Sequence, residues 1–393
     1  MANRFATMDR RDKTGRVLPY HAPVSRPLRL AYLADPNSVH TRRWLGFFAE
    51  RGHEVHLLVG ERDEVRDLPD GITLHRYRRF GPRRLPLVSS LQGRGRLRVA
   101  LRSINPDVLH AHYLTRHGWQ ARLSGFHPYV ASPWGSDLFV TPRESLRARI
   151  WAWLTLVGAD LVTVVSDHMH DEVARYGVAA HRIERVRFGV DTDRFVPDPS
   201  ARAPELVGER RFILAPRAIR PIYRPDVVID AFARLSADVV LVMTTRNADG
   251  ETLADVERRI ARLDLNDRVL LAGEIDDALM LALCRTAEVV ISVPESDAIP
   301  VSVLEAMSCA RPVVATDLPG PRELLGPYSP ELLVPVGDVA ATTSAIRRAL
   351  EMSPGARASL GGALRADVVA TADRRRNMER MEELYERLRE RSG

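Results

Sequence analysis

Residues 294–320 read PESDAIPVSVLEAMSCARPVVATDLPG, and they directly follow an apolar run at residues 289–293. The apolar run predicts a buried strand, which is followed by a short loop, a helix that opens after Pro300 and a second apolar run at residues 313–316. Two parallel strands need a crossover connection of this kind, because a tight turn can join only antiparallel strands. The segment therefore predicts an α/β fold with a parallel sheet.

The same alternation of apolar runs and helical patterns extends over most of the chain in both directions. A stretch with three prolines, at residues 197–204, interrupts it once and reads as a linker. Before this stretch we expect strands at 28–34, 55–59, 108–110, 129–132 and 161–165, with helices such as 40–51 and 144–157 between them. After it we expect strands at 212–215, 239–244, 269–272, 289–293, 313–316 and 332–334, and helices at 226–236, 253–263, 276–286 and 301–310.

This pattern predicts two doubly wound, Rossmann-like domains facing each other across a cleft, where the carboxyl ends of the strands bind ligands. A charge-rich helix at the C-terminus has apolar residues at helical spacing and should pack back on a domain. We expect a disordered tail at 1–25, an N-terminal Rossmann-like domain at 26–198, a linker at 199–210, a C-terminal Rossmann-like domain at 211–370 and the C-terminal helix at 371–393, which we expect to cross back to the N-terminal domain.

The composition excludes several classes of protein. Of the 57 Lys and Arg residues only Lys13 is a lysine, so a phosphate-binding P-loop and a lysine Schiff base in the body of the chain are excluded. No apolar run is long enough to span a membrane, and the N-terminus lacks the apolar core of a signal peptide, so we expect a cytoplasmic protein. The two cysteines, Cys284 and Cys309, stand in apolar helical context and are expected in the core.

Basic residues outnumber acidic ones by six, and much of this excess falls in one window with few acidic residues. The window contains Arg76, Arg78, Arg79, Arg83, Arg84, Arg94, Arg96, Arg98 and Arg102. Such a region suits phosphate groups. It is either a solvated basic face or a peripheral contact with the anionic inner face of a membrane. Nucleic acid is not expected as a partner, because the window matches no known nucleic-acid-binding module.

The loop and helix after residue 293 carry the residues best suited to catalysis and ligand binding. Glu295 and Asp297 lie in the loop, and Ser302 lies in the first turn of the helix, whose unpaired N–H groups could hold a phosphate. Glu305 lies one turn further on among apolar neighbours, where a carboxylate needs hydrogen-bond donors. Ribose hydroxyls or an arginine would both serve, and the residues alone do not decide between these partners.

Residues 297–305 and the PVVAT run resemble the retaining glycosyltransferases of family 4, the group 1 glycosyltransferases of GT-B fold. The family hallmark is a carboxylate followed eight residues later by a glutamate that opens LEAM, which Asp297 and Glu305 match. Further resemblances are GHEV at 52–55, PDVLHAH at 106–112 and VRFGVD at 186–191 with FVP at 195–197. The departures are Asp for Glu at 297, Ala298 for Gly and Phe188 for Asn.

The resemblance implies transfer of a sugar from a nucleotide diphosphate sugar to a glycan, lipid or small-molecule acceptor, with retention and without a metal or other cofactor. It implies that Glu305 holds the ribose, that Asp297 faces the donor sugar, and that Arg217 and Arg224 grip the diphosphate. Arg224 replaces the usual lysine, and arginine keeps the positive charge with planar geometry. The expected donor-binding set is completed by Ala298, Ile299, Pro300, Val301, Ser302 and Ile275, and the expected catalytic set is Asp297, Arg217 and Arg224.

On the N-terminal side the resemblance is looser. The usual His-Gly after the fifth strand is replaced by a loop with Trp134 and Asp137, and a tryptophan cannot accept a proton. We assign to the acceptor side of the cleft His40, Arg42, Arg43, His112, Trp134 and Asp137. The alternatives on the same fold are a nucleotide-sugar epimerase and a protein that binds a nucleotide sugar without turning it over.

Overall fold

The computed structural model describes the chain at residues 10–11, 17–18, 26–77, 87–245, 247–273 and 275–392. Within this part the strands form two large sheets, and every strand pair with a recorded register in them is parallel. This confirms the predicted fold class of two doubly wound α/β sheets. A two-residue antiparallel pair, β1 (Arg10–Arg11) with β2 (Val17–Leu18), is the described part of the predicted tail, whose other residues lie outside the described residues.

The first sheet has seven strands in the order β5-β4-β3-β6-β7-β8-β9. Its strands are β3 (Arg29–Leu33), β4 (Glu54–Gly60), β5 (Ile72–Tyr77), β6 (Val108–His112), β7 (Tyr129–Ser132), β8 (Leu161–Val164) and β9 (Ile183–Arg185). The accompanying helices are α1 (Val39–Glu50), α2 (Leu87–Ile104), η1 (Leu114–Gly118), α3 (Trp119–Ser124), α4 (Ser136–Phe139), α5 (Thr141–Glu144), α6 (Leu146–Gly158), α7 (Asp167–Arg175) and η2 (Ala180–Arg182). The two edge strands β5 and β9 were not expected from the sequence.

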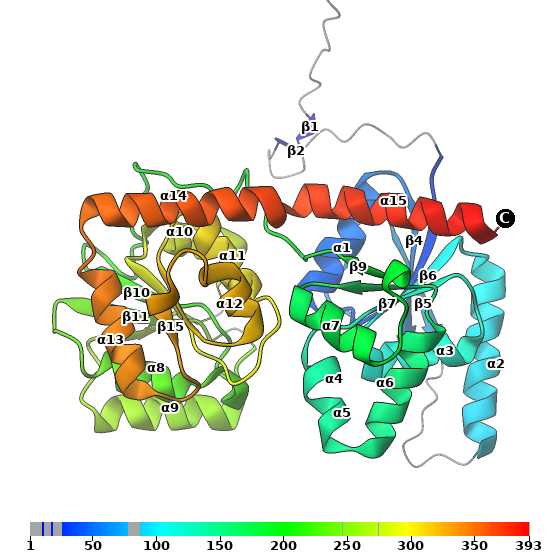
Figure 1. Cartoon of the computed structure of the whole chain (residues 1–393), viewed down its shortest axis with the longest axis horizontal. Helices are drawn as coiled ribbons and strands as arrows, with labels where there is room; N and C mark the ends of the chain where they lie inside the picture. Colours follow the sequence, from blue (N-terminus) through cyan, green and yellow to red (C-terminus); the bar gives the residue numbers. More distant parts are fainter. Residues whose placement is uncertain are drawn as a thin grey trace, which may run out of the picture. The chain divides into compact units, whose positions relative to one another are not determined.

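The second sheet has six strands in the order β12-β11-β10-β13-β14-β15. Its strands are β10 (Arg211–Ala215), β11 (Val239–Met243), β12 (Val269–Leu271), β13 (Val289–Ser292), β14 (Val313–Thr316) and β15 (Leu333–Val334). The helices are η3 (Pro221–Tyr223), α8 (Pro225–Phe232), α9 (Gly250–Arg262), α10 (Asp277–Thr286), α11 (Val301–Ser308), α12 (Pro319–Leu325), η4 (Pro330–Leu332), α13 (Val339–Leu350), α14 (Pro354–Thr371) and α15 (Arg374–Ser392). Figure 1 shows α8, α9 and α13 on one side of this sheet and α10, α11 and α12 on the other.

Residue contacts divide the chain into two units. The first contains Met1–Pro133, Leu146–Val162 and Glu382–Gly393, and the second contains Trp134–Ser145 and Thr163–Met381. The division falls inside β8 and inside α15, so neither unit is a continuous piece of chain. The strand cores are apolar as expected, and both cysteines are buried and free in the second unit, which confirms their prediction as core residues.

The end of α15 enters the core of the first unit through polar contacts. The Tyr385 hydroxyl lies 3.2 Å from the Tyr32 hydroxyl and hydrogen-bonds with His110 Nδ1. Glu382 Oε1 lies 2.6 Å from His53 Nε2, and Glu382 Oε2 lies 2.7 Å from Arg51. Burial would raise the pKa of Glu382, but these two partners outweigh burial and lower it. Polar pairing, as well as apolar packing, therefore holds the C-terminal helix in the first unit.

The arginine-rich region is only partly described. Arg78, Arg79, Arg83 and Arg84 lie outside the described residues, whereas Arg76 lies on β5 and Arg94, Arg96, Arg98 and Arg102 lie on α2. Among the described helices, none combines the length and the apolar character needed to cross a bilayer.

Two buried histidines on β6 make the first unit sensitive to acid. Burial lowers the pKa of His110 well below its ordinary value and lowers that of His112 to about 3. Below pH 6.5 these two histidines would therefore bind protons in the unfolded chain but not in the folded chain. Each histidine contributes stability that is complete above pH 6.5 and is lost, at about 1.4 kcal/mol per pH unit, as the pH falls toward the folded-state pKa.

We therefore expect the free energy of unfolding to fall between pH 6.5 and pH 5, and to fall less steeply in His112→Phe. Urea titrations at pH 5.0, 5.75, 6.5 and 7.25 measure this slope. The exposed His181 provides a control through His181→Asn, which should keep the wild-type slope. A slope unchanged in His112→Phe would contradict the role of this histidine.

Candidate active site

Two neighbouring strands of the second unit bring the predicted donor-binding loops together. β10 pairs in parallel with β13, with Ile213 opposite Val289, so both strands end at the same edge of the sheet. The loop after β10 continues to residue 224, and the loop after β13 runs from 293 to 300. A main-chain hydrogen bond joins the two loops, from the Glu295 N–H to the Ile222 carbonyl at 2.9 Å.

Arg217 and Asp297 form an ion pair across these loops. Arg217 Nη2 lies 2.8 Å from Asp297 Oδ2, and both side chains are less than one-fifth exposed. The Arg217 guanidinium also stacks on the ring of Tyr223, with Cζ 4.1 Å from the ring centroid. Asp297 Oδ1 accepts a hydrogen bond from the Ala298 N–H at 2.9 Å. Two residues that the resemblance assigned to the same donor site are thus in direct contact.

Arg224 is held between two carboxylates. Its Nε and Nη2 lie 2.9 and 2.7 Å from the two oxygens of Asp226, and its Nη1 lies 3.1 Å from Glu295 Oε1. Its backbone is left-handed, with φ 50° and ψ 55°, and Pro225 follows as the first residue of α8. Pairing with Asp226 raises the pKa of Arg224, whereas burial would raise the pKa of Asp226 but Arg224 outweighs burial and lowers it.

The charges of this cluster nearly cancel. Two arginines (217 and 224) face three carboxylates (226, 295 and 297), so the five side chains carry a net charge of −1 when all are ionised. Each guanidinium has five N–H donors, more than these pairs occupy. The arginines are therefore oriented by carboxylates and still have donors for an anion.

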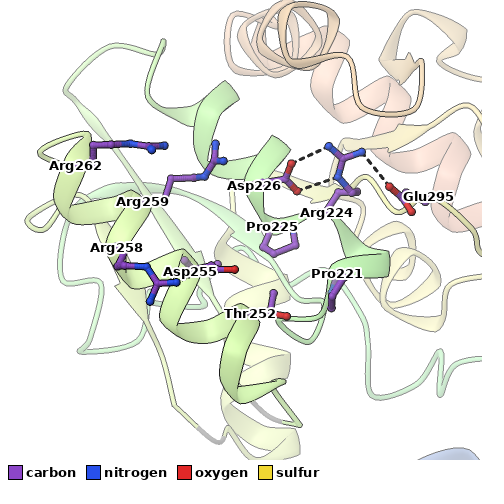
Figure 2. A pocket seen from close by; sticks show the side chains of 11 residues that line it. Pro221, Arg224, Pro225, Asp226, Thr252, Asp255, Arg258, Arg259, Arg262 and Glu295 are labelled. Carbon is purple, nitrogen blue, oxygen red and sulfur yellow. Dashed lines mark hydrogen bonds and ion pairs between the residues drawn. The ribbon is translucent and has the colours of Figure 1, made fainter.

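A pocket of about 620 Å³ opens beside Arg224, between the start of α8 and the length of α9 from Thr252 to Arg262. Figure 2 shows Arg224 between Asp226 and Glu295. The pocket is lined by Pro221, Arg224, Pro225, Asp226, Thr252, Asp255, Val256, Arg258, Arg259, Arg262 and Glu295. Of the predicted donor-binding residues, Arg224 alone belongs to this lining, so the pocket reaches the cluster from the α9 side and does not contain Arg217 or Asp297.

The start of α11 continues the cluster. Pro300 precedes the helix, and among the described residues no side chain caps its first turn, which holds Val301 and Ser302. Ala298, Ile299 and Pro300 are buried, as is Ile275 in the loop after β12. Glu305 lies on α11 with 6% exposure, between Leu304 and Ala306, which are fully buried. The helix start therefore offers main-chain N–H groups next to the Arg217–Asp297 pair.

Two known protein families match this chain. Residues 29–186 match the family described as "Glycosyl transferase 4-like", and residues 198–366 match "Glycosyl transferases group 1". The chain belongs to the group 1 glycosyltransferases. Its two matched segments together cover most of the chain and correspond to the two sheets.

Individual relatives match the chain at low sequence identity. A D-inositol 3-phosphate glycosyltransferase of Geodermatophilus obscurus is 28% identical over 281 residues, covering 65% of this chain and 62% of the relative. The chain thus spans less than two thirds of that relative's length. A GDP-mannose-dependent alpha-mannosyltransferase of Mycolicibacterium smegmatis is 28% identical over 345 residues, covering 78% of this chain and 83% of the relative.

Solved structures show the GT-B fold. Sucrose-phosphate synthase from Thermosynechococcus elongatus has a TM-score of 0.75 at 19% identity, covering 91% of this chain and 98% of the other. Anabaena HepE in complex with UDP-glucose has a TM-score of 0.73 at 16% identity, covering 91% of this chain and 99% of the other.

In this group 1 glycosyltransferase, Trp134 and Asp137 are counted with the second unit. The Trp134 ring packs edge-on against Phe188, with centroids 5.2 Å apart. Asp137 is fully buried, and its Oδ1 accepts hydrogen bonds from the N–H groups of Trp134 and Gly135 at 2.9 and 3.0 Å. A Cβ added to Gly135 would lie 3.5 Å from that of Ala298. Asp137 shapes this loop, and the acceptor role of both residues stays a prediction.

The other predicted acceptor residues lie in the first unit. His40, Arg42 and Arg43 are in the first turns of α1, where Arg42 lies 3.8 Å from Asp67. His112 ends β6, and its buried ring packs edge-on against Trp44 at 5.2 Å between centroids. Their role toward an acceptor also stays a prediction.

Sequence reasoning did not assign Tyr223 or Asp226. Tyr223 directly precedes Arg224 in the loop, and Asp226 is the second residue of α8. An aspartate two residues after an arginine at a helix start was an available signal. Within the described part of the chain no group of three His, Cys, Asp or Glu side chains is arranged to hold a metal ion.

Gly320 controls the position of the Asp297 loop. It lies at the start of α12, where an added Cβ would overlap the carbonyl oxygen of Ala298. We expect Gly320→Ala to lower the free energy of unfolding by about 2 kcal/mol, because backbone must move to admit the methyl group. Urea titration measures this difference.

The matched control is Gly362→Ala on α14, where an added Cβ would meet nothing within 4 Å. This substitution should be neutral or stabilising by up to about 1 kcal/mol, since alanine favours helix. Equal effects of the two substitutions would contradict the close approach of Gly320 to the loop.

Proposed function

We propose that this chain transfers a glycosyl group from a nucleotide diphosphate sugar to a hydroxyl acceptor, with retention of the anomeric configuration. The observation that carries the proposal is the Arg217–Asp297 ion pair at 2.8 Å beside Arg224, where β10 and β13 end. It places two arginines and a carboxylate within one loop cluster. Diphosphate and sugar hydroxyls are the groups that such side chains bind.

The arginines stabilise the leaving group in the proposed reaction. The bond between the sugar C1 and the diphosphate oxygen breaks, its electron pair stays on the diphosphate, and the acceptor hydroxyl oxygen bonds to C1 on the same face. The acceptor proton passes to the departing phosphate oxygen, so no enzyme base is needed. Arg217, Arg224 and the N-terminus of α11 offset the charge that develops on the diphosphate.

The remaining assignments follow the family pattern. Glu305, buried on α11, accepts hydrogen bonds from the ribose hydroxyls, and Asp297 accepts from the donor sugar. A relative named for its dependence on GDP-mannose, and a fold relative bound to UDP-glucose, support a nucleotide sugar as the donor class. We propose that the reaction requires no metal ion, and that it takes place in the cytoplasm or on the inner face of its membrane.

A donor screen tests the proposal. The chain is incubated in excess EDTA with UDP-glucose, UDP-N-acetylglucosamine, GDP-mannose and ADP-glucose, and products are followed by mass spectrometry and by NMR. We expect slow release of nucleoside diphosphate from at least one donor. Interconversion of nucleotide sugars would instead indicate an epimerase, and binding without turnover would indicate a binding protein.

Glu305→Ala tests the site within the same screen. Loss of the ribose contact should weaken binding of the matching nucleoside diphosphate at least tenfold, since a charged acceptor contributes about 1.5–3 kcal/mol per hydrogen bond. Calorimetry measures the affinity, and circular dichroism checks that the variant is folded. Wild-type affinity in a folded Glu305→Ala variant would refute the ribose assignment.

Substitutions of Arg224 and of its partner Glu295 should change the affinity for nucleoside diphosphate in opposite directions. Arg224→Ala should weaken nucleoside diphosphate binding about tenfold, because a charge-assisted contact is lost. Glu295→Gln should strengthen it a few-fold, because an exposed carboxylate that competes with the anion for Arg224 becomes neutral.

The matched control is Arg348→Ala on the outer side of α13, an exposed arginine of the same unit. It should leave the affinity unchanged in the same calorimetric titration. Wild-type affinity in Arg224→Ala, or equal losses in Arg224→Ala and Arg348→Ala, would contradict direct contact of Arg224 with the diphosphate.

A further inference from the structure

Helix α6 in the first unit has one face packed in the core. Ala152, Thr155 and Leu156 are fully buried. The Tyr129 hydroxyl donates to the Thr155 carbonyl at 2.7 Å, and the Trp151 ring lies 6.1 Å from that of Trp119 on α3. Figure 1 shows α6 running beside α3. These contacts fix the rotation of the helix about its axis.

The opposite face of α6 is apolar and exposed. Leu146, Ile150 and Trp153 are 65%, 47% and 47% exposed. Their spacing of four and three residues places them in one line along the helix. Only two other large hydrophobic residues of the described chain are as exposed, Val99 and Val336, and neither lies on α6. A contiguous line of this kind marks an interaction surface.

The charges around this line are all positive on α6 itself. The helix reads LRARIWAWLTLVG and has no acidic residue. At about 100° per residue, Arg149 and Arg147 fall on opposite sides of the apolar line, and both are exposed. An apolar line with an aromatic residue and arginine flanks is typical of helices that lie in a membrane interface.

We propose that α6 docks on an anionic lipid surface. Leu146, Ile150 and Trp153 enter the boundary between headgroups and acyl chains, and the flanking arginines contact lipid phosphates. Self-association through this face is the less favourable alternative. A twofold contact between copies would bring the arginines of one α6 close to those of the other without an acidic residue on the helix to pair with them.

The proposal does not depend on glycosyl transfer, because binding to vesicles is measured without a donor. The full chain is sedimented with vesicles of equal parts phosphatidylglycerol and phosphatidylcholine, and with vesicles of phosphatidylcholine alone. We expect partition to the anionic vesicles, weakened by salt. Ile150→Gln combined with Trp153→Gln should lower this partition at least about tenfold, and Arg149→Gln should lower it about fivefold.

Two controls match these substitutions in exposure. Val336→Gln changes an exposed residue in the second unit, and Arg348→Gln removes an exposed arginine there, and both should bind vesicles as the wild type does. Equal thermal melting of all variants excludes unfolding as the cause of any loss. Absence of wild-type binding, or equal binding by the Ile150/Trp153 variant, would overturn the proposal. If the wild type does not bind vesicles but forms a dimer, and the Ile150/Trp153 variant is a monomer, the face is assigned to self-association.

Discussion

The hydrogen bond from the Glu295 N–H to the Ile222 carbonyl joins the two loops on which the candidate site is built. It forms because β10 and β13 are neighbours although α8, α9 and α10 separate them in sequence. Parallel pairing makes both strands end at one edge, so the residues after each strand meet there. Arg217 reaches Asp297 and Arg224 reaches Glu295 for the same reason. The site is thus a consequence of strand order more than of any single side chain.

The strand order also explains what the sequence could and could not predict. Buried strands such as β10 and β13 are continuous apolar runs, and the helix after Pro300 has a clear start signal, so these elements were predicted closely. Strand β5 reads ITLHRY with partly exposed residues, and β9 has three residues. Edge strands of this kind have no apolar run, because only one neighbour and part of one face bury them.

The site was predicted in its residues but not in its pairing. Asp297, Glu305, Arg217 and Arg224 follow from motif and resemblance, which depend on local spacing. The contacts of Arg224 with Asp226 and of Arg217 with Tyr223 depend on the path of the loop after β10, including its left-handed turn at residue 224. Spacing along the chain does not encode these features, so the near-neutral charge of the cluster emerged only from the structure.

That charge balance bears on why arginine suits position 224. A lysine is a point charge and could not make the two parallel contacts with Asp226 while also reaching Glu295. Held in this way, the guanidinium is oriented before an anion arrives, so less conformational entropy is lost on binding. The same carboxylates weaken the hold on an anion. In the proposed reaction, which releases a nucleoside diphosphate after each transfer, an oriented but partly neutralised cation favours turnover over tight product binding.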